Sequence, residues 1–265
     1  MRKILGLLTV LTVTVLAACS GANEDDLVIG LECNYAPFNW TTNDETGEAI
    51  DGVNAYCDGY DVAIAQTIAE EMGRNLVIRK IDWDGLIPAL TSGTIDAIIA
   101  GMSPTAERAL VVNFSDAYFR SEQVLVVSND SPFVNATSLE DFSGASVVAQ
   151  MGTLQDTLID QIPDVDHRDP LNDYPSLVAQ VQSGITDALV AEYEVAQSIV
   201  SANNTLSLVS LGDNGFSVLE EQVTVSVAVR KEDEAMRDNI NDILASIDEE
   251  TRRELMDAAQ ARQPE

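Results

Sequence analysis

The sequence predicts an α/β protein of two similar lobes, and an internal repeat is the main observation behind that prediction. Residues 83–108 are partly repeated, without a gap, by residues 174–196, where Ser92-Gly93 and Asp96-Ala97 match Ser183-Gly184 and Asp187-Ala188. Each copy has apolar residues at helical spacing, a Ser-Gly C-cap, and a short apolar run that suits a strand buried on both faces. A helix that leads into a buried strand at two places indicates two α/β lobes of similar design.

The ends of these two strands predict where a ligand binds. In open α/β sheets, small ligands bind in the crevice beyond the carboxyl ends of the strands. The first copy reaches that end at Gly101, Met102 and Ser103, and the second reaches it at Glu192. We therefore expect both strand ends to face one cleft, and Gly101, Met102, Ser103 and Glu192 to bind a ligand there.

The other elements follow from apolar periodicity and from the residues that break it. Apolar runs predict further strands at residues 27–31, 76–81, 123–128, 144–150, 206–211 and 223–229. Helical spacing predicts helices over 62–72 and within 233–261, a helical turn at 138–142, and a helix from Gly152-Thr153. Segment 41–51 is polar and is expected to be a hairpin or loop, and a helix is expected to begin just after Ser103.

Two crossings of the chain define the expected lobes. The strand at 123–128 is placed to leave the first lobe, and the strand at 223–229 is placed to return to it. Two connections form a hinge rather than a flexible linker. We expect lobe 1 to contain residues 27–120 and 221–265, and lobe 2 to contain residues 121–220.

The N-terminus has the anatomy of an export signal. Arg2-Lys3 precedes an uncharged run at 4–15 that is too short to span a membrane. Leu16-Ala17-Ala18-Cys19 resembles the bacterial lipobox, which implies cleavage before Cys19 and lipid attachment to its sulfur. We expect residues 1–18 to be a signal peptide and residues 19–26 to be a lipid-anchored tether. An ordinary secretory signal with an incidental cysteine is the alternative.

Export would leave Cys33 and Cys57 in an oxidising compartment, where disulfides persist. A bridge between them is expected, and two buried free thiols are the alternative. The formal net charge of −30 argues against nucleic acid as a partner, because nucleic-acid binding needs basic patches. The same charge would draw cationic solutes toward a cleft.

A small set of side chains carries the expected binding chemistry. Arg108 follows closely on the strand end at Gly101 to Ser103, where backbone N–H groups and its guanidinium suit a carboxylate. Glu192 ends the matching strand of the other lobe, so an α-amino acid zwitterion would find both of its partners. Tyr35 and Trp83 are placed at strand ends, where aromatic rings can sandwich a side chain or hold a cation. Surface ion pairs and core packing are the alternatives for these residues.

Catalytic patterns are missing from the sequence. It has one histidine, no Gly-x-Ser-x-Gly elbow, no cluster of His and Cys with metal-ligand spacing, and no Gly-rich phosphate loop. We expect no cofactor, no metal and no catalytic residue. An enzyme on this fold, such as a cyclohexadienyl-dehydratase-like lyase, would have only Glu32 as an obvious general acid or base.

Four segments carry a family resemblance: LECNYAPFNW, GYDVAIAQTIAEEMG, WDGLIPALTSGTIDAIIAGMSPTAER and FSDAYF. They resemble the polar-amino-acid solute-binding proteins of ABC importers, bacterial extracellular solute-binding family 3. The resemblance runs from about Leu27 to the C-terminal helices. It implies the type II periplasmic-binding-protein fold, with two Rossmann-like lobes joined by a two-strand hinge.

The resemblance also implies roles for the site residues. Arg108 would hold the ligand's α-carboxylate, with the backbone amide of Ser103, with Thr153 and with the amide of Leu154. The Gly101 carbonyl and Glu192 would hold the α-ammonium group. Tyr35 and Trp83 would stack on the ligand side chain, and Glu32 would contact its far end. Two departures from the family pattern are Glu192, where Asp is frequent, and Leu154, where Thr or Gly is common.

The expected function is therefore that of an extracytoplasmic, lipid-anchored binding protein. It would be a monomer that closes on a free L-amino acid and delivers it to the transmembrane subunits of an ABC permease. Two acids and aromatic walls favour arginine or lysine as the ligand, with glutamine or histidine as the runner-up. A sensory role is a third possibility, which would require a signalling domain or a dedicated partner.

Overall fold

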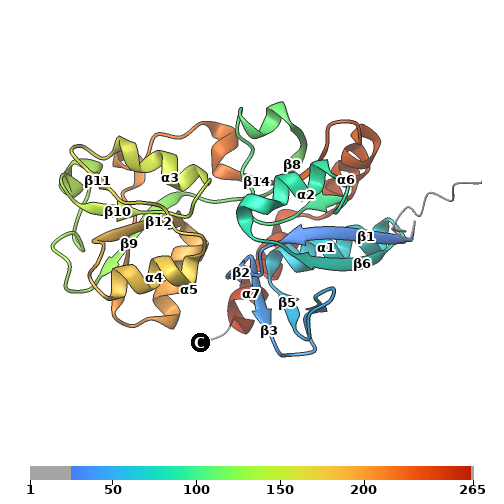
Figure 1. The fold of residues 1–265 in the computed structure, drawn as a ribbon, viewed down its shortest axis with the longest axis horizontal. Coiled ribbons are helices and arrows are strands. Elements are labelled where there is room, and N and C mark those ends of the chain that lie inside the picture. Colours follow the sequence, from blue (N-terminus) through green and yellow to red (C-terminus); the bar gives the residue numbers. More distant parts are fainter. Residues whose placement is uncertain (1–24, 264–265) are drawn as a thin grey trace, which may run out of the picture.

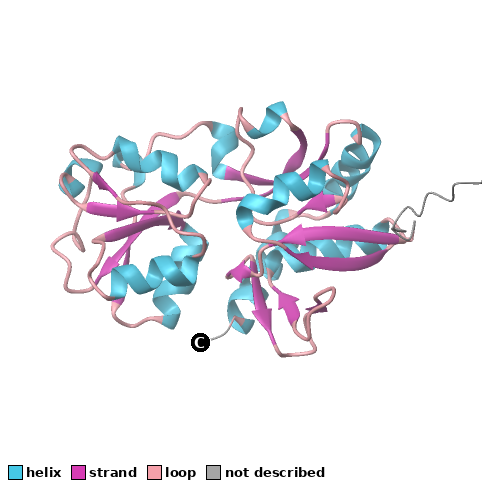
Figure 2. Ribbon diagram, viewed as in Figure 1, coloured by secondary structure: helices cyan, strands magenta, loops and turns pink. Residues whose placement is uncertain are grey.

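The computed structural model describes residues 25–263, which form two α/β lobes side by side (Figure 1). The predicted fold class is confirmed, since each lobe has a five-stranded mixed sheet flanked by helices (Figure 2). The predicted signal peptide (1–18), the lipidation site Cys19 and most of the tether (19–26) lie outside the described residues.

The sheet of lobe 1 has the strand order β6-β1-β7-β14-β8. The apolar side chains of β1 are all buried, which explains why this run forms an inner strand. β1 pairs in parallel with β6 and β7, whereas β14 is antiparallel to both β7 and β8. The bounds are β1 Asp26–Leu31, β6 Asn75–Lys80, β7 Ala97–Ile98, β8 Val112–Arg120 and β14 Thr224–Arg230.

Helices cover this sheet and complete the core of lobe 1. Gly59 starts α1 with a positive φ, and a Cβ at that position would lie 2.2 Å from the Phe38 carbonyl oxygen, so only glycine fits there. The helices of this lobe are α1 Tyr60–Glu71, η1 Trp83–Gly85, α2 Leu86–Thr91, η2 Arg108–Leu110, α6 Glu234–Ser246 and α7 Glu249–Arg262.

A small antiparallel sheet extends lobe 1 and contains the segment predicted as a hairpin or loop. Its order is β2-β3-β5-β4, with bounds β2 Asn34–Tyr35, β3 Asn39–Thr42, β4 Glu48–Ala49 and β5 Tyr56–Asp58. β3 and β4 both pair with β5 rather than with each other. The sulfur atoms of Cys33 and Cys57 are joined as a disulfide, which ties the end of β1 to β5.

Lobe 2 repeats the same design with the strand order β11-β10-β12-β9-β13. Its strands are β9 Gln123–Ser128, β10 Ser146–Val148, β11 Asp166–His167, β12 Ala188–Glu192 and β13 Leu206–Val209. Its helices are η3 Leu139–Phe142, α3 Leu154–Leu158, η4 Ile159–Gln161, α4 Tyr174–Gln182 and α5 Tyr193–Ala202. Two more short turns, η5 Gly212–Asn214 and η6 Glu220–Val223, lie on the way back to lobe 1.

The chain passes between the sheets twice, from β8 to β9 and from β13 to β14. The two passages touch, because the Ser121 backbone N–H donates to the Val223 carbonyl at 2.9 Å. Two adjacent passages that run antiparallel to each other restrict the relative motion of the lobes to a hinge.

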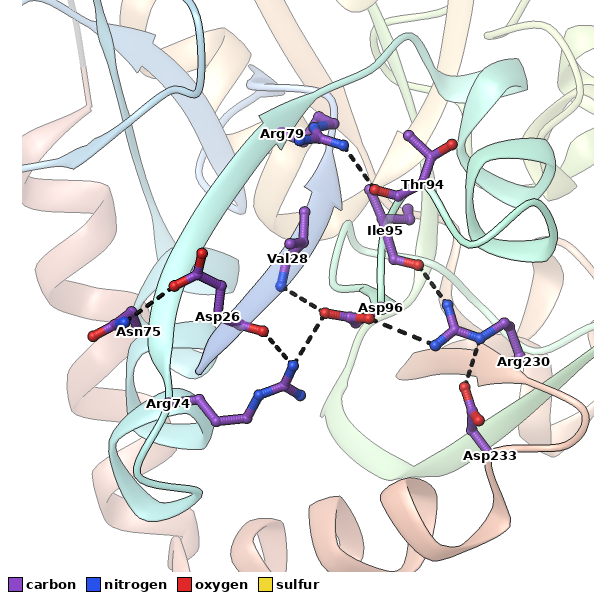
Figure 3. A network of polar contacts seen from close by, with 10 residues as sticks. All are labelled: Asp26, Val28, Arg74, Asn75, Arg79, Thr94, Ile95, Asp96, Arg230 and Asp233. Atoms are coloured by element: carbon purple, nitrogen blue, oxygen red, sulfur yellow. Dashed lines mark hydrogen bonds and ion pairs between the residues drawn. The ribbon is translucent and has the colours of Figure 1, made fainter. Parts of the chain in front are cut away.

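The repeated aspartates have matching structural roles. Asp96 accepts a hydrogen bond from the Val28 backbone N–H of β1 at 3.0 Å, and Asp187 accepts one from Ser146 N–H of β10 at 2.8 Å. Figure 3 shows that Asp96 also pairs with Arg74 and Arg230, at 3.4 and 3.5 Å. In each lobe the repeated aspartate therefore joins neighbouring parallel strands.

One sequence-based expectation about these elements holds only in part, and another is wrong. The strand expected after the first Ser-Gly cap is present as β7, but its ordered pairing covers only two residues. The helix expected after Ser103 does not form, since residues 104–107 are irregular and only the 3₁₀ turn η2 follows. Pro104 lacks a backbone N–H and restricts the residue before it, which favours an extended entry here.

Candidate ligand-binding site

A pocket lies between the lobes. Side chains of lobe 1 and lobe 2 line it in similar number: Glu32, Tyr35, Trp83, Gly101, Ser103 and Arg108, and then Gln150, Thr153, Leu154, Gln155, Tyr174 and Glu192. Met102, which we predicted to bind ligand, does not line the pocket. It is buried, and its carbonyl accepts a hydrogen bond from Ser226 N–H at 3.0 Å, so it belongs to the core.

Arg108 of lobe 1 reaches across the pocket to lobe 2. Its guanidinium donates to the Ser103 carbonyl at 2.8 Å and to the Gly152 carbonyl at 3.1 Å, and it lies 5.1 Å from the centre of the Trp83 ring. Burial lowers the pKa of Arg108 to about 10, against the opposing effect of Glu192 and Glu107. The group is thus a cation at neutral pH, and it offers N–H donors toward the pocket.

Glu192 of lobe 2 is the acidic counterpart. It ends β12 directly before α5, it is 4% exposed, and it accepts a hydrogen bond from the Tyr35 hydroxyl of lobe 1. Burial raises the pKa of Glu192, while hydrogen bonds from Tyr35 and Gln155 act to lower it. A cationic group entering the pocket would favour its ionised form.

Glu32 follows the last residue of β1 and is held by lobe 2. The Gln150 side-chain amide donates to its two carboxylate oxygens at 2.8 and 3.0 Å, and to the Asn172 carbonyl at 2.9 Å. Burial, with the charges of Asp173 and Asp82, raises the pKa of Glu32 to about 7 against the lowering effects of Gln150 and Lys80. A second buried acid therefore lies in the pocket.

Aromatic rings form the walls. The rings of Tyr35 and Tyr174 lie 4.9 Å apart, and Trp83 donates from Nε1 to the Gly152 carbonyl at 3.2 Å. Phe38 is fully buried behind Tyr35 and belongs to the core. Thr153, which also lines the pocket, caps α3 and accepts from Asp156 N–H at 3.4 Å.

Three lining residues were missed by the sequence analysis: Gln150, Gln155 and Tyr174. Two of them had a usable signal. Gln150 is the last residue of the predicted strand 144–150. The expectation that ligands bind beyond the carboxyl ends of strands (the strand-end rule) therefore applied to it as it did to Glu192. Tyr174 occupies the position of Trp83 in the gapless repeat. Gln155 points into the pocket from the first turn of α3, and nothing in the sequence distinguishes it.

The pocket combines a guanidinium on one lobe, a carboxylate on the other, and aromatic walls between them. This arrangement suits a small zwitterion held by both lobes at once. Within residues 25–263, no group of three or more His, Cys, Asp or Glu side chains is placed to hold a metal ion.

Comparison with known protein families also indicates a solute-binding protein. Residues 27–258 match the family model of the bacterial extracellular solute-binding proteins, family 3, and the chain belongs to that family. The predicted resemblance is thereby confirmed. Members of this family are solute-binding proteins, in agreement with the prediction of a binding protein rather than an enzyme.

Individual relatives cover nearly the whole chain. An arginine-binding extracellular protein of Bacillus subtilis is 28% identical over 94% of this chain and 94% of its own length. A probable histidine-binding protein of Campylobacter jejuni is 29% identical, over 82% of each chain. Among solved structures, the arginine-bound form of a truncated ArgBP from T. maritima is 33% identical, with a TM-score of 0.70, covering 84% of this chain and 97% of that chain.

No helix within residues 25–263 is both long and apolar enough to cross a membrane.

Proposed function

We propose that this protein is the solute-binding component of an ABC importer and that it binds a basic L-amino acid, arginine or lysine, between its lobes. The observation that carries the proposal is the separation of opposite charges, with the guanidinium of Arg108 on lobe 1 and the carboxylate of Glu192 on lobe 2. A zwitterion contacting both would stabilise the closed arrangement, because a ligand shifts a conformational equilibrium only through differential contacts.

The proposed pose follows from donors and acceptors at the pocket wall. Arg108, the Ser103 amide and the start of α3 at Thr153 and Leu154 would bind the α-carboxylate, since a charge-assisted fork suits that group. Glu192 and the Gly101 carbonyl would bind the α-ammonium group. The ligand side chain would then extend between Tyr35, Trp83 and Tyr174 toward Glu32.

The preference for a basic ligand rests on Glu32. A buried carboxyl at the far end of an aromatic slot gains most from a cationic partner, because pairing relieves its desolvation. The B. subtilis relative is named as an arginine-binding protein, and the T. maritima structure is an arginine-bound form. Both support this preference. The C. jejuni relative is named for histidine, which keeps a less basic ligand as the second candidate.

The location follows from the N-terminal sequence and the family. We infer export by residues 1–18 and anchoring through a lipid on Cys19, so that the lobes lie outside the cell membrane and pass the ligand to the permease. The protein would act as a monomer, with residues 27–120 and 221–265 as lobe 1 and residues 121–220 as lobe 2.

Isothermal titration of the protein without its first 18 residues, against L-arginine, L-lysine, L-histidine and L-glutamine, tests the proposal. We expect arginine or lysine to bind with the lowest Kd and the ligand to be recovered chemically unchanged. Tightest binding of glutamine would refute the role of Glu32, and binding of none of these four amino acids would refute the proposed function. Glu32→Gln is the matched control, because it keeps the size of the side chain and removes the charge.

A further inference from the structure

A buried carboxylate lies beneath the pocket without lining it. Asp61, in the first turn of α1, is fully buried. One of its oxygens accepts from the Tyr118 hydroxyl at 2.7 Å, and the other accepts from the Asn39 side-chain amide at 2.8 Å. Both donors are neutral, so the carboxylate is buried with hydrogen bonds alone. Burying a charge in this way is costly, and stability alone does not account for it.

The two donors continue to two backbone segments. The Tyr118 hydroxyl also accepts from the Gly101 backbone N–H at 3.1 Å. Asn39 Oδ1 accepts from the Cys33 backbone N–H at 2.7 Å. Asp61 is therefore the centre of a hydrogen-bond network that runs from Gly101 to Cys33. One carboxylate oxygen accepts the hydrogen bond of each arm.

Both backbone segments belong to the wall of the pocket. Gly101 lines it with a φ of 60°, and a Cβ at that position would lie 2.7 Å from the Tyr35 ring. Cys33 has a φ of 51°, a conformation that non-glycine residues adopt rarely, and it separates Glu32 from the strand that carries Tyr35. These conformations need support from their surroundings, and the arms of Asp61 supply it.

The backbone N–H groups of Gly101 and Cys33, at the two ends of this network, fix the direction of its hydrogen bonds. A backbone N–H can only donate, so the Tyr118 oxygen accepts from Gly101 and its own proton points to Asp61. For the same reason Asn39 turns its oxygen to Cys33 and its NH₂ to Asp61. Both oxygens of Asp61 then accept, an arrangement that favours the ionised carboxylate, which has acceptors and no donor. Although burial raises the pKa of Asp61 to about 6, against hydrogen bonds from Tyr118 and Asn39, the group is ionised at neutral pH.

We propose that Asp61 is a positioning residue for ligand binding, which holds Gly101 through Tyr118 and the Cys33 turn through Asn39 in the geometry that the pocket requires. This inference rests on the proposed function, because it assigns binding roles to Gly101, Tyr35 and Glu32. Asp61 itself makes no contact with the ligand.

Three single variants, and the double variant of Asp61 and Tyr118, test the proposal. Asp61→Asn places an NH₂ donor against a donor and breaks one arm, and Tyr118→Phe removes one hydroxyl from the Gly101 arm. Asp187→Asn is the matched control, because Asp187 likewise accepts two hydrogen bonds, from the backbone N–H and the hydroxyl of Ser146, but lies in lobe 2, at the opposite end of β12 from the pocket. Circular dichroism and ¹H–¹⁵N spectra establish that each variant is folded.

Two readouts are measured: the Kd for L-arginine, and the chemical shift of the Gly101 amide proton without ligand. We expect Asp61→Asn and Tyr118→Phe each to weaken binding at least about fivefold, and the double variant to be much less than additive, since both cut the same hydrogen-bond network. The Gly101 amide should shift in both variants. Asp187→Asn should lower Tm yet leave the Kd and the Gly101 shift unchanged.

The outcomes separate this proposal from the proposed function. If the wild type binds arginine and both variants bind it within about twofold of the wild type, the positioning role is refuted. An unchanged Gly101 shift in Tyr118→Phe also refutes it, even if Asp61→Asn fails to fold. If the wild type binds no amino acid, the proposed function fails, and the Gly101 shift still decides whether Asp61 and Tyr118 support that segment.

Discussion

Arginine binding should depend on pH through Glu32. Burial holds the pKa of this carboxyl at about 7 in the ligand-free pocket, and a guanidinium beside it would lower that pKa to its ordinary range or below. The sign follows directly: the ligand-free protein retains a proton below about pH 7, and binding must expel it. Affinity should therefore rise with pH and level off above about pH 7.

The size of the effect follows from the two ionised fractions. With a pKa of about 7, roughly nine tenths of the Glu32 carboxyls are ionised at about pH 8, but only about one in thirty at about pH 5.5. The Kd for arginine should then be about 30-fold higher at the lower pH, a difference of about 2 kcal/mol.

Calorimetry checks this in two ways. The Kd is measured at several pH values, and proton release is measured near pH 6 in buffers of different ionisation enthalpy. Glu192 and Asp61 also titrate at raised pKa, so Glu32→Gln is needed to isolate one group. The variant should release about one proton fewer than the wild type. Equal proton release in the two proteins would refute the assignment of Glu32 to the distal end of the ligand.

Three further predictions concern affinity and stability. Arg108→Ala should weaken arginine binding by at least about 3 kcal/mol, because it leaves a carboxylate unpaired, and near-normal affinity by calorimetry would contradict the pose. Replacing both Cys33 and Cys57 by serine opens a loop with a sequence separation of 24 and should lower the free energy of unfolding by about 3 kcal/mol, measured by urea titration; an unchanged midpoint would argue against that. Partial burial acts to lower the pKa of His167, but hydrogen bonds and charges of Asp156 and Asp160 raise it overall. The stability that protonated His167 adds is therefore fully present below the ordinary histidine pKa of about 6.5, and it is lost as pH rises through the raised pKa. His167→Asn should thus cost up to about 1 kcal/mol at pH 6 and almost nothing at pH 9, and a pH-independent loss would exclude this ion pair as the cause.

Local patterns were sufficient for most of the fold. Strands buried on both faces, such as β1 and β12, form continuous apolar runs, and the Ser-Gly caps end α2 and α4 where the repeat placed them. Helix α5 was missed because it follows Glu192 directly, with no capping side chain or turn residue to announce it. The entry to Arg108 was predicted as a helix, and Pro104 and its neighbours form irregular backbone instead.

The site was predictable where strand ends supplied it and not where distant segments meet. The strand-end rule found Gly101, Ser103 and Glu192, and it applied equally to Gln150. By contrast, Asp61 meets partners that are 22 and 57 residues away, and its burial depends on how α1 packs against β8. Such pairings depend on the assembled core, and spacing in the sequence carries no record of them.

The gapless repeat has a consequence for how the pocket can change. Equivalent positions of the two copies stand on opposite walls: Trp83 faces the cavity as Tyr174 does, and Gly101 as Glu192 does. The two copies thus supply equivalent positions to the cavity, whereas an amino acid has two unlike ends. At one equivalent pair the two residues differ, because Gly101 offers a carbonyl and Glu192 offers an acid. This difference gives the cavity the two unlike sides that an amino acid requires. Substitutions at the Trp83 and Tyr174 pair would therefore reshape the walls of the cavity, whereas its polarity is fixed by the backbone, since a Cβ at Gly101 would lie 2.7 Å from the Tyr35 ring.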